Sequence, residues 1–229
     1  VLDSLFHLTT RGRQGPVFPI IPADLQAAAL PEPLTFSPTA DPAAPSIDSR
    51  SADMAVDLLL KATAPVVLVG TGVDWSGAQR EVQEVAELLS LPVATSYTAK
   101  GVFPENHPLA LGCLGVGGRP YAKEFFLKSD LVLALGTTFS EGTTMGFGHR
   151  TIPDQTKIIQ IDIDPDELGR NYPTQLSVQA DVKAAVRSII DGITRKRPIT
   201  AAGGSGRGRE IEQAKHACRS DVDRKIANA

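Results

Sequence analysis

The chain has 229 residues, of which 42% are hydrophobic and 21% are charged, and its formal net charge is −3. This length and apolar content can supply a buried core, which excludes a disordered or fibrous protein. Acids and bases are interspersed without a basic stripe, so we expect no nucleic-acid partner. No apolar run approaches the roughly 20 residues that cross a bilayer, so we expect no membrane partner and a cytoplasmic location.

Residues 1–28 and the segment that follows them differ in amino-acid composition. Residues 1–28 include the run GPVFPII, which predicts a short strand. Residues 29–48 are rich in proline and poor in apolar anchors, which indicates a linker at a domain boundary.

Residues 49–194 alternate between helical and strand patterns. The sequence predicts helices over 49–63, 76–90, 119–129 and 181–193, and strands over 64–72, 91–96, 130–138, 157–164 and 175–180. Strands separated by helices favour parallel crossovers. The predicted fold class is therefore α/β, a doubly wound parallel sheet with helices on both faces. Residues 195–229 turn glycine-rich and charged and then become a polar helix-like tail, which indicates a second linker.

The turn VGTGVDWSGA follows a predicted strand and contains Gly70 and Gly72. Glycines at such a turn let backbone N–H groups and a helix N-terminus approach a phosphate. The third glycine is Gly77, so the spacing is not G-x-G-x-x-G, and a nicotinamide fingerprint is absent. A tight turn without a ligand is an equal alternative.

Two further glycine-rich turns follow predicted strands, LGCLGVGGRP and LGTTFSEGTTMGFG. Turns after parallel strands meet at one edge of a sheet, so we expect a cleft there. The stretch KIIQIDIDPDELGRN adds Asp162 at a strand end, where a carboxylate can accept hydrogen bonds from a ribose or an adenine amine. Asp164 precedes Pro165, and with Glu167 it favours a capping role at the next helix.

No catalytic constellation follows from the residues. Ser140 is not in a G-x-S-x-G elbow, and Glu141 is a lone loop carboxylate. The cysteines Cys113 and Cys218 form no CxxC pair, which is typical of reduced thiols. The four histidines lack a metal-ligand spacing, so we expect no metal site in this chain.

Several stretches resemble the thiamine-diphosphate-dependent decarboxylases and synthases. GRQGPVFPIIPADLQ resembles the end of their N-terminal, pyrimidine-binding domain, residues 1–28 here. The stretches APVVLVGTG, TAKGVFPENHPLALGCLG, KSDLVLALGTTFS and IIQIDIDPDELGRN resemble their central domain, residues 49–194, in an acetolactate synthase-like branch.

The resemblance implies a parent enzyme that joins or cleaves 2-oxo acids, a transferase or lyase that uses thiamine diphosphate and Mg²⁺. In that family the activating glutamate lies in the N-terminal domain, and the GDG segment that holds magnesium lies in the C-terminal domain. The nearest match here, Ile190-Asp191-Gly192, lacks the first glycine. The resemblance therefore implies a fragment that is inert alone, whose partners are the remaining domains of a homodimeric or homotetrameric parent, with residues 195–229 leading toward a diphosphate-binding domain.

The resemblance also implies FAD or ADP in the central domain. The contacts would fall on Gly70, Gly72, Gly115, Gly117, Gly118, Gly136, Thr137, Thr138, Phe139, Asp162, Ile163 and Asp181. Thr138 stands where acetolactate synthases commonly have an arginine, which counts against FAD. Two alternatives stay open, a stand-alone nucleotide-binding module of another class and a purely structural assembly domain.

Overall fold

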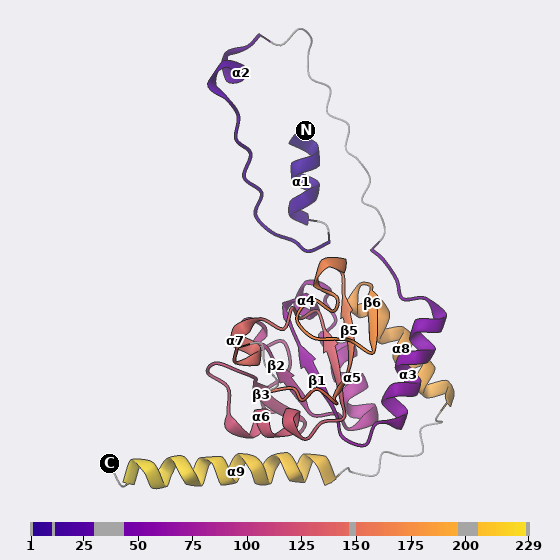
Figure 1. Ribbon diagram of the computed structural model, residues 1–229, viewed down its shortest axis with the longest axis vertical. Coiled ribbons are helices and arrows are strands. Elements are labelled where there is room, and N and C mark those ends of the chain that lie inside the picture. The colour runs from indigo at the N-terminus through magenta and orange to yellow at the C-terminus, as the bar shows by residue number, and fades with distance from the viewer. Residues whose placement is uncertain (1, 11, 30–43, 147–149, 197–205, 228–229) are drawn as a thin grey trace. The chain divides into compact units, whose positions relative to one another are not determined.

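The computed structural model describes residues 2–10, 12–29, 44–146, 150–196 and 206–227 (Figure 1). It forms two compact units, unit 1 over Val1–Ala44 and unit 2 over Pro45–Ala229. The boundary falls inside the predicted linker over 29–48, most of which lies outside the described residues.

The described part of unit 1 holds two helices, α1 over Leu2–Thr10 and α2 over Ala23–Ala27. Neither was predicted. The strand predicted in GPVFPII is wrong, because the structure has no strand over residues 15–21. A strand requires a hydrogen-bonded neighbour, and the described part of unit 1 contains no other strand with which this run could pair.

Unit 2 is built on a six-stranded parallel sheet with the order β3-β2-β1-β4-β5-β6. The strands are β1 over Pro65–Val69, β2 over Val93–Thr95, β3 over Ala110–Cys113, β4 over Leu131–Leu135, β5 over Lys157–Asp162 and β6 over Leu176–Gln179. The predicted parallel α/β sheet is confirmed. β3 was missed as a strand, because its sequence ALGC reads as part of a glycine-rich turn.

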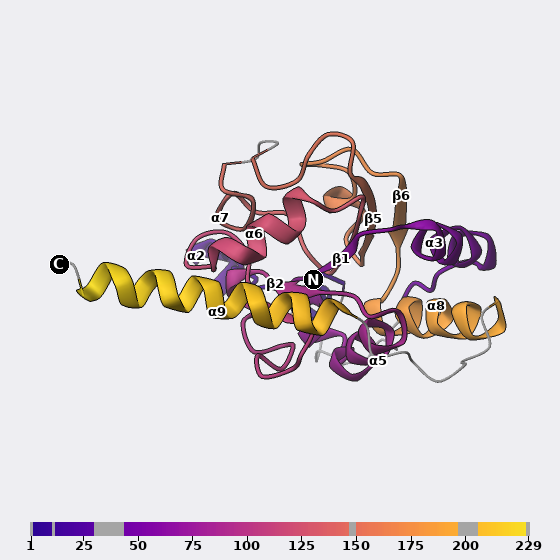
Figure 2. The same ribbon diagram turned by 90° about the horizontal axis from the view of Figure 1, so that it is seen from below.

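The helices of unit 2 cover both faces of the sheet (Figures 1 and 2). They are α3 over Ser49–Lys61, α4 over Thr71–Trp75, α5 over Gln79–Leu89, α6 over Pro120–Leu127, α7 over Glu141–Thr144, α8 over Val182–Lys196 and α9 over Gly206–Ala227, with 3₁₀ turns η1 over Tyr97–Ala99 and η2 over Pro165–Glu167. The crossovers containing α5 and α6 run in opposite directions along the sheet, so right-handed connections put these two helices on opposite faces. α8 packs against α3 and α5.

Burial follows the sequence pattern. β1, β4 and β5 occupy the middle of the sheet, and their side chains are buried apart from those of Pro65 and Lys157 at two strand starts. Strands covered on both faces need such continuous apolar runs. In the helices the apolar side chains recur on one stripe, as with Val82, Val85 and Ala86 in α5.

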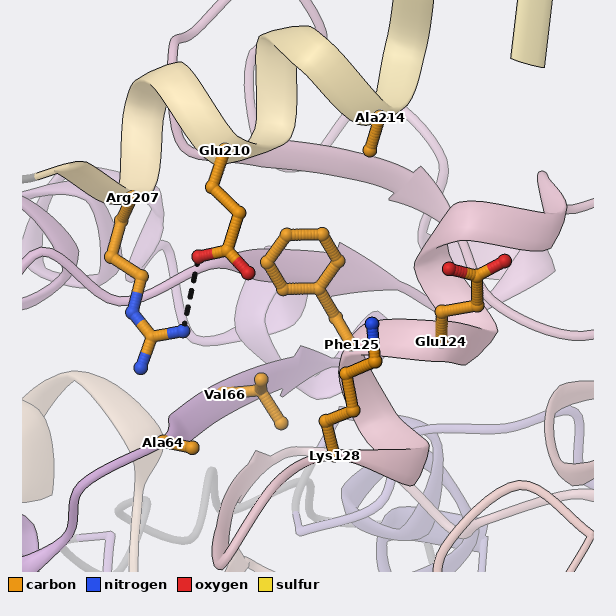
Figure 3. Close-up of a pocket in the computed structure, with 8 residues that line it drawn as sticks. All are labelled: Ala64, Val66, Glu124, Phe125, Lys128, Arg207, Glu210 and Ala214. Carbon is orange, nitrogen blue, oxygen red and sulfur yellow. Dashed lines mark hydrogen bonds and ion pairs between the residues drawn. The ribbon is translucent and has the colours of Figure 1, made fainter. Parts of the chain in front are cut away.

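Helix α9 belongs to unit 2 and packs beside α6 (Figure 2). Ile211 is completely buried, and Arg207 donates from Nη2 to the carbonyl oxygen of Thr63 at 2.8 Å. Between α9, α6 and the start of β1 lies a cavity of about 100 Å³, bordered by Phe125, Lys128 and Glu210 (Figure 3). The helix-like tail predicted from the sequence is confirmed.

Candidate functional site

The loops that follow the strands meet at one edge of the sheet, which we call the carboxyl edge. The strand ends are level there, since Val69 pairs with Leu135 on one side and with Thr95 on the other. The strand order reverses between β1 and β4, and this switch point is where ligands bind in open α/β sheets. The structure brings all the predicted site residues to this edge, from the loops after β1, β3, β4, β5 and β6.

Gly70 and Gly72 pack directly against the loop after β4. A Cβ atom on Gly70 would lie 2.0 Å from the carbonyl oxygen of Gly136, and one on Gly72 would lie 2.7 Å from the Gly136 Cα. The Gly70 N–H donates to the Leu135 carbonyl at 2.9 Å, and the Gly72 N–H donates to the Gly136 carbonyl at 3.1 Å. These glycines therefore allow two backbones to touch, and both N–H groups already have protein acceptors.

The glycine turn after β3 packs in the same way. A Cβ on Gly115 would lie 2.1 Å from the carbonyl oxygen of Gly142, and one on Gly118 would lie 2.3 Å from that of Cys113. The Gly118 N–H donates to the Gly115 carbonyl at 2.9 Å. Gly117 has φ +75°, and the nearest atoms to its Cβ position belong to the Tyr97 ring at 3.8 Å. Of these three glycines, only Gly117 is exposed and free of a backbone contact at its Cβ position.

The loop after β4, Gly136 to Phe139, is tied to the segment that follows β5. The Thr137 carbonyl accepts from Gln160 Nε2 at 3.2 Å, and the Thr138 carbonyl accepts from Asn171 Nδ2 at 2.8 Å. Phe139 has φ +48°, is almost completely buried and packs on the Tyr172 ring at 5.2 Å between centroids. The core therefore holds Phe139 and keeps its ring from solvent.

Gln160, Asn171 and Tyr172 were missed from the sequence. Gln160 is buried in β5, where it also donates to the Glu167 carbonyl at 2.9 Å and accepts from the Gly169 N–H at 2.9 Å. The one available signal was a glutamine inside the apolar run KIIQID, since a buried amide requires partners.

The acids after β5 divide between the strand end and the next turn. Asp162 is 7% exposed and accepts from the Asp164 N–H at 3.0 Å, and the half-buried Ile163 follows it. Asp164 caps η2 by accepting from the Asp166 N–H at 3.0 Å, so its predicted capping role is confirmed. Glu167 is buried and pairs with Arg170 at 2.9 Å.

Asp181 follows β6 and starts α8. Its Oδ1 accepts from the Ala184 N–H at 3.0 Å, and its Oδ2 accepts from Ser76 Oγ at 2.7 Å. Ser76 Oγ in turn accepts from the Lys183 N–H at 2.9 Å. Asp181 thus caps a helix and ties the loop after β1 to α8.

The chemistry available at this edge is limited. Burial raises the pKa of the Cys113 thiol at the end of β3, so this thiol stays protonated near neutral pH.

Within the described ranges, no three His, Cys, Asp or Glu side chains gather where they could hold a metal ion. In the same part of the chain, every helix is too short or too polar to cross a bilayer.

A buried hydroxyl at the carboxyl edge lacks a partner among the described residues. The hydroxyl of Thr95, at the end of β2, is buried and has no hydrogen-bond partner within the described part of the chain. A buried hydroxyl is normally hydrogen-bonded to protein or to ordered water.

The parallel sheet and its glycine-packed edge define a doubly wound, Rossmann-like α/β domain. Residues 52–189 match the family model described as the thiamine pyrophosphate enzyme, central domain. The chain belongs to the thiamine pyrophosphate enzymes, as a central domain of the acetolactate synthase-like branch.

Several relatives are called acetolactate synthases or acetolactate synthase large subunits. The chain is 34% identical over 200 residues to a probable acetolactate synthase large subunit of Methanococcus aeolicus, which covers 83% of this chain and 32% of the relative. It is also 34% identical over 200 residues to an acetolactate synthase of Arthrospira platensis, covering 83% of this chain and 34% of the relative. The chain thus spans about a third of their length.

A third relative carries a different name. The chain is 37% identical over 147 residues to a sulfoacetaldehyde acetyltransferase of Rhodobacter capsulatus, covering 64% of this chain and 25% of the relative.

Proposed function

We propose that this chain is the central scaffold domain of a longer thiamine-diphosphate enzyme that joins or cleaves 2-oxo acids. The observation that carries the proposal is the family match over residues 52–189 in a chain that spans only about a third of its acetolactate synthase relatives. The packing supports a scaffold, because the predicted contact glycines hold neighbouring loops together. The parent would be a cytoplasmic homodimer or homotetramer that binds thiamine diphosphate and Mg²⁺ through its other domains.

This proposal predicts that the chain alone is catalytically inert. The 229-residue protein, assayed with pyruvate, thiamine diphosphate and Mg²⁺, should show no turnover, and calorimetric titration should show no thiamine diphosphate binding. The parent-length protein should bind the cofactor under the same conditions. Turnover by the isolated chain, or a parent without affinity for thiamine diphosphate, would refute the proposal.

An adenine nucleotide, FAD or ADP, at the carboxyl edge is a second candidate function. The unpartnered Thr95 hydroxyl supports it. Against it, the N–H groups of Gly70 and Gly72, which would hold phosphates, already donate to backbone carbonyls. A phosphate would have to use other N–H groups, such as those of Thr138 or Gly117.

Titration of the chain with FAD and with ADP tests this candidate. Thr95→Val and Asp162→Ala should each abolish binding if the nucleotide lies on these residues. Thr95→Val removes a hydroxyl without an acceptor, so it should leave stability nearly unchanged. Wild-type protein that binds neither nucleotide at millimolar concentration would leave only the scaffold role.

A further inference from the structure

The cavity between α9, α6 and the start of β1 lies at the opposite end of the sheet from the carboxyl edge. It has a volume of about 100 Å³, and none of the candidate site residues borders it. A cavity of about 150 Å³ can hold one benzene ring, so this space suits a ligand of about four to six non-hydrogen atoms.

The floor of the cavity is apolar. The side chains of Val66 and Phe125 are buried, at 2% and 8% exposure, and Ala64 and Ala214 complete the apolar lining. Removing an aliphatic group from water against such a floor favours binding. Ala214 belongs to α9, whereas Val66 and Phe125 belong to β1 and α6. A ligand in this space would therefore touch α9 and the body of unit 2 at the same time.

Four charged side chains border the cavity, two acidic and two basic. Arg207 pairs with Glu210 at 3.4 Å and donates to the Thr63 carbonyl at 2.8 Å, so the charges of Arg207 and Glu210 offset each other. Lys128 forms no ion pair and no side-chain hydrogen bond with any described residue. In the view of Figure 3, Glu124 lies beyond Lys128 on the side away from Arg207. The uncompensated charge beside the apolar floor is therefore positive.

This arrangement favours a ligand with a carboxylate head and a short alkyl group. Figure 3 shows Val66 between Lys128 and Arg207, so an anionic head group above Val66 faces both cations. A guanidinium has five N–H donors, and the contacts of Arg207 to Glu210 and Thr63 occupy two of them. Ammonium and guanidinium groups form strong, charge-assisted hydrogen bonds with carboxylates. An inorganic anion would match the cations but would not cover the apolar floor.

We propose that this cavity binds a small aliphatic monocarboxylate of about two to four carbons, with its carboxylate at Lys128 and its alkyl group on Val66 and Phe125. Because α9 forms one wall, an occupied cavity holds α9 on unit 2. The site is independent of the proposed function, since every group in it belongs to this chain and its test requires no turnover.

Titration of the 229-residue chain with propionate, followed by the backbone amide signals in NMR spectra, tests the site. Propionate should shift the signals of residues 64, 66, 124–128 and 207–214 and should saturate in the millimolar range. Hydrogen exchange along 207–214 should slow about tenfold when propionate is present at about ten times its Kd. Propionamide has the same shape without the charge, so it should bind about fivefold or more weakly.

Variants of two lysines on α6 separate the carboxylate contact from a general charge effect. Lys128 is exposed, so Lys128→Met should fold normally and should weaken propionate binding about fivefold or more while leaving propionamide binding unchanged. Lys123→Met is the matched control, because Lys123 lies on the same helix and does not border the cavity. Ala214→Leu fills the cavity from α9 and should abolish the binding of both compounds.

Three results would overturn the proposal. The first is the absence of shifted amide signals at about 0.1 M propionate, where a millimolar site would be filled. The second is equal affinity for propionate and propionamide, or an equal loss of affinity in Lys123→Met and Lys128→Met. The third is reproduction of the same shifts by sodium chloride at matched ionic strength, which would show a response to anions without a site for the alkyl group.

Discussion

At the scale of single residues, the glycines of the carboxyl edge have a packing role that their sequence context did not reveal. A glycine after a parallel strand suits a phosphate and suits a close backbone contact equally well. In this chain Gly70, Gly72 and Gly115 all face backbone atoms of a neighbouring loop. Their substitution therefore affects folding whether or not a ligand binds.

Gly70→Ala should be strongly destabilising. The new Cβ would lie 2.0 Å from the Gly136 oxygen, and both groups belong to backbone that is hydrogen-bonded in the sheet. We expect a loss of about 3 kcal/mol or more in the free energy of unfolding, measured by urea denaturation. Gly142→Ala is the matched control, because its Cβ position has no atom within 4 Å. Equal stability of the two variants would contradict the packing role.

Asp130 should make stability depend on acid pH. Partial burial raises the pKa of its carboxyl group, but hydrogen bonds from the Thr63 N–H, the Thr63 hydroxyl and the Ala64 N–H outweigh burial and hold the pKa below its ordinary value. A carboxyl whose folded pKa is lowered stabilises the fold above its unfolded pKa, and this contribution is lost as the pH falls through the folded pKa.

Denaturation of wild type and Asp130→Asn between about pH 6 and pH 2 checks this. The variant should be less stable at pH 6, and its stability should fall less steeply below about pH 4. Parallel curves for the two proteins would show that Asp130 contributes nothing to the acid dependence.

At the scale of elements, one buried side chain organises the loops after β4 and β5. Gln160 hydrogen-bonds to the Thr137 carbonyl, the Glu167 carbonyl and the Gly169 N–H, all outside its own strand. Because both loops border the carboxyl edge, this amide helps to set the shape of the candidate site. Asn171 adds a parallel tie to Thr138.

Gln160→Met should loosen both loops. The substitution keeps the approximate side-chain volume but leaves buried carbonyl and N–H groups without partners, at a cost of about 3 kcal/mol. Thermal denaturation measures the loss, and hydrogen exchange should rise at residues 137–139 and 167–170. The control is Gln179→Met, whose amide makes a single 3.5 Å contact from a mostly exposed position in β6. Unchanged exchange in those loops would show that the hydrogen bonds of Gln160 do not restrain them.

At the scale of the whole molecule, α9 is part of unit 2 rather than a free tail. Its inward stripe includes Ile211, which is completely buried, and Arg207, which bonds to Thr63. Burial also lowers the pKa of Lys215, which lies further along the helix. The segment after α8 was expected as a linker, and residues 197–205 of it lie outside the described residues.

Ile211→Ala should weaken the packing of α9. Removing a buried isoleucine side chain costs about 2–5 kcal/mol when the surroundings remain in place. If α9 detaches instead, the cost is smaller and hydrogen exchange along 207–218 rises selectively. The exposed neighbour Gln213→Ala is the control. Wild-type stability together with wild-type exchange in Ile211→Ala would show that α9 does not pack as described.

The sequence by itself determined the parallel α/β class, most of the helices and strands of unit 2, and membership of the thiamine pyrophosphate enzymes. These follow from local periodicity and from motifs that can be read along the chain. Local pattern failed at GPVFPII, because a strand depends on a neighbour, and at β3, because ALGC is short and ends in a glycine turn.

Only the tertiary structure decided what the carboxyl edge is made of. Backbone contacts between Gly70 and Gly136, the ties from Gln160, and the capping by Asp181 all join residues distant in sequence. Such contacts depend on which strands become neighbours, and no local sequence pattern predicts the strand order. The exposure of Trp75 and Tyr97 is likewise decided by the tertiary structure. The local sequence around an aromatic residue in a loop does not indicate whether its side chain is buried or exposed.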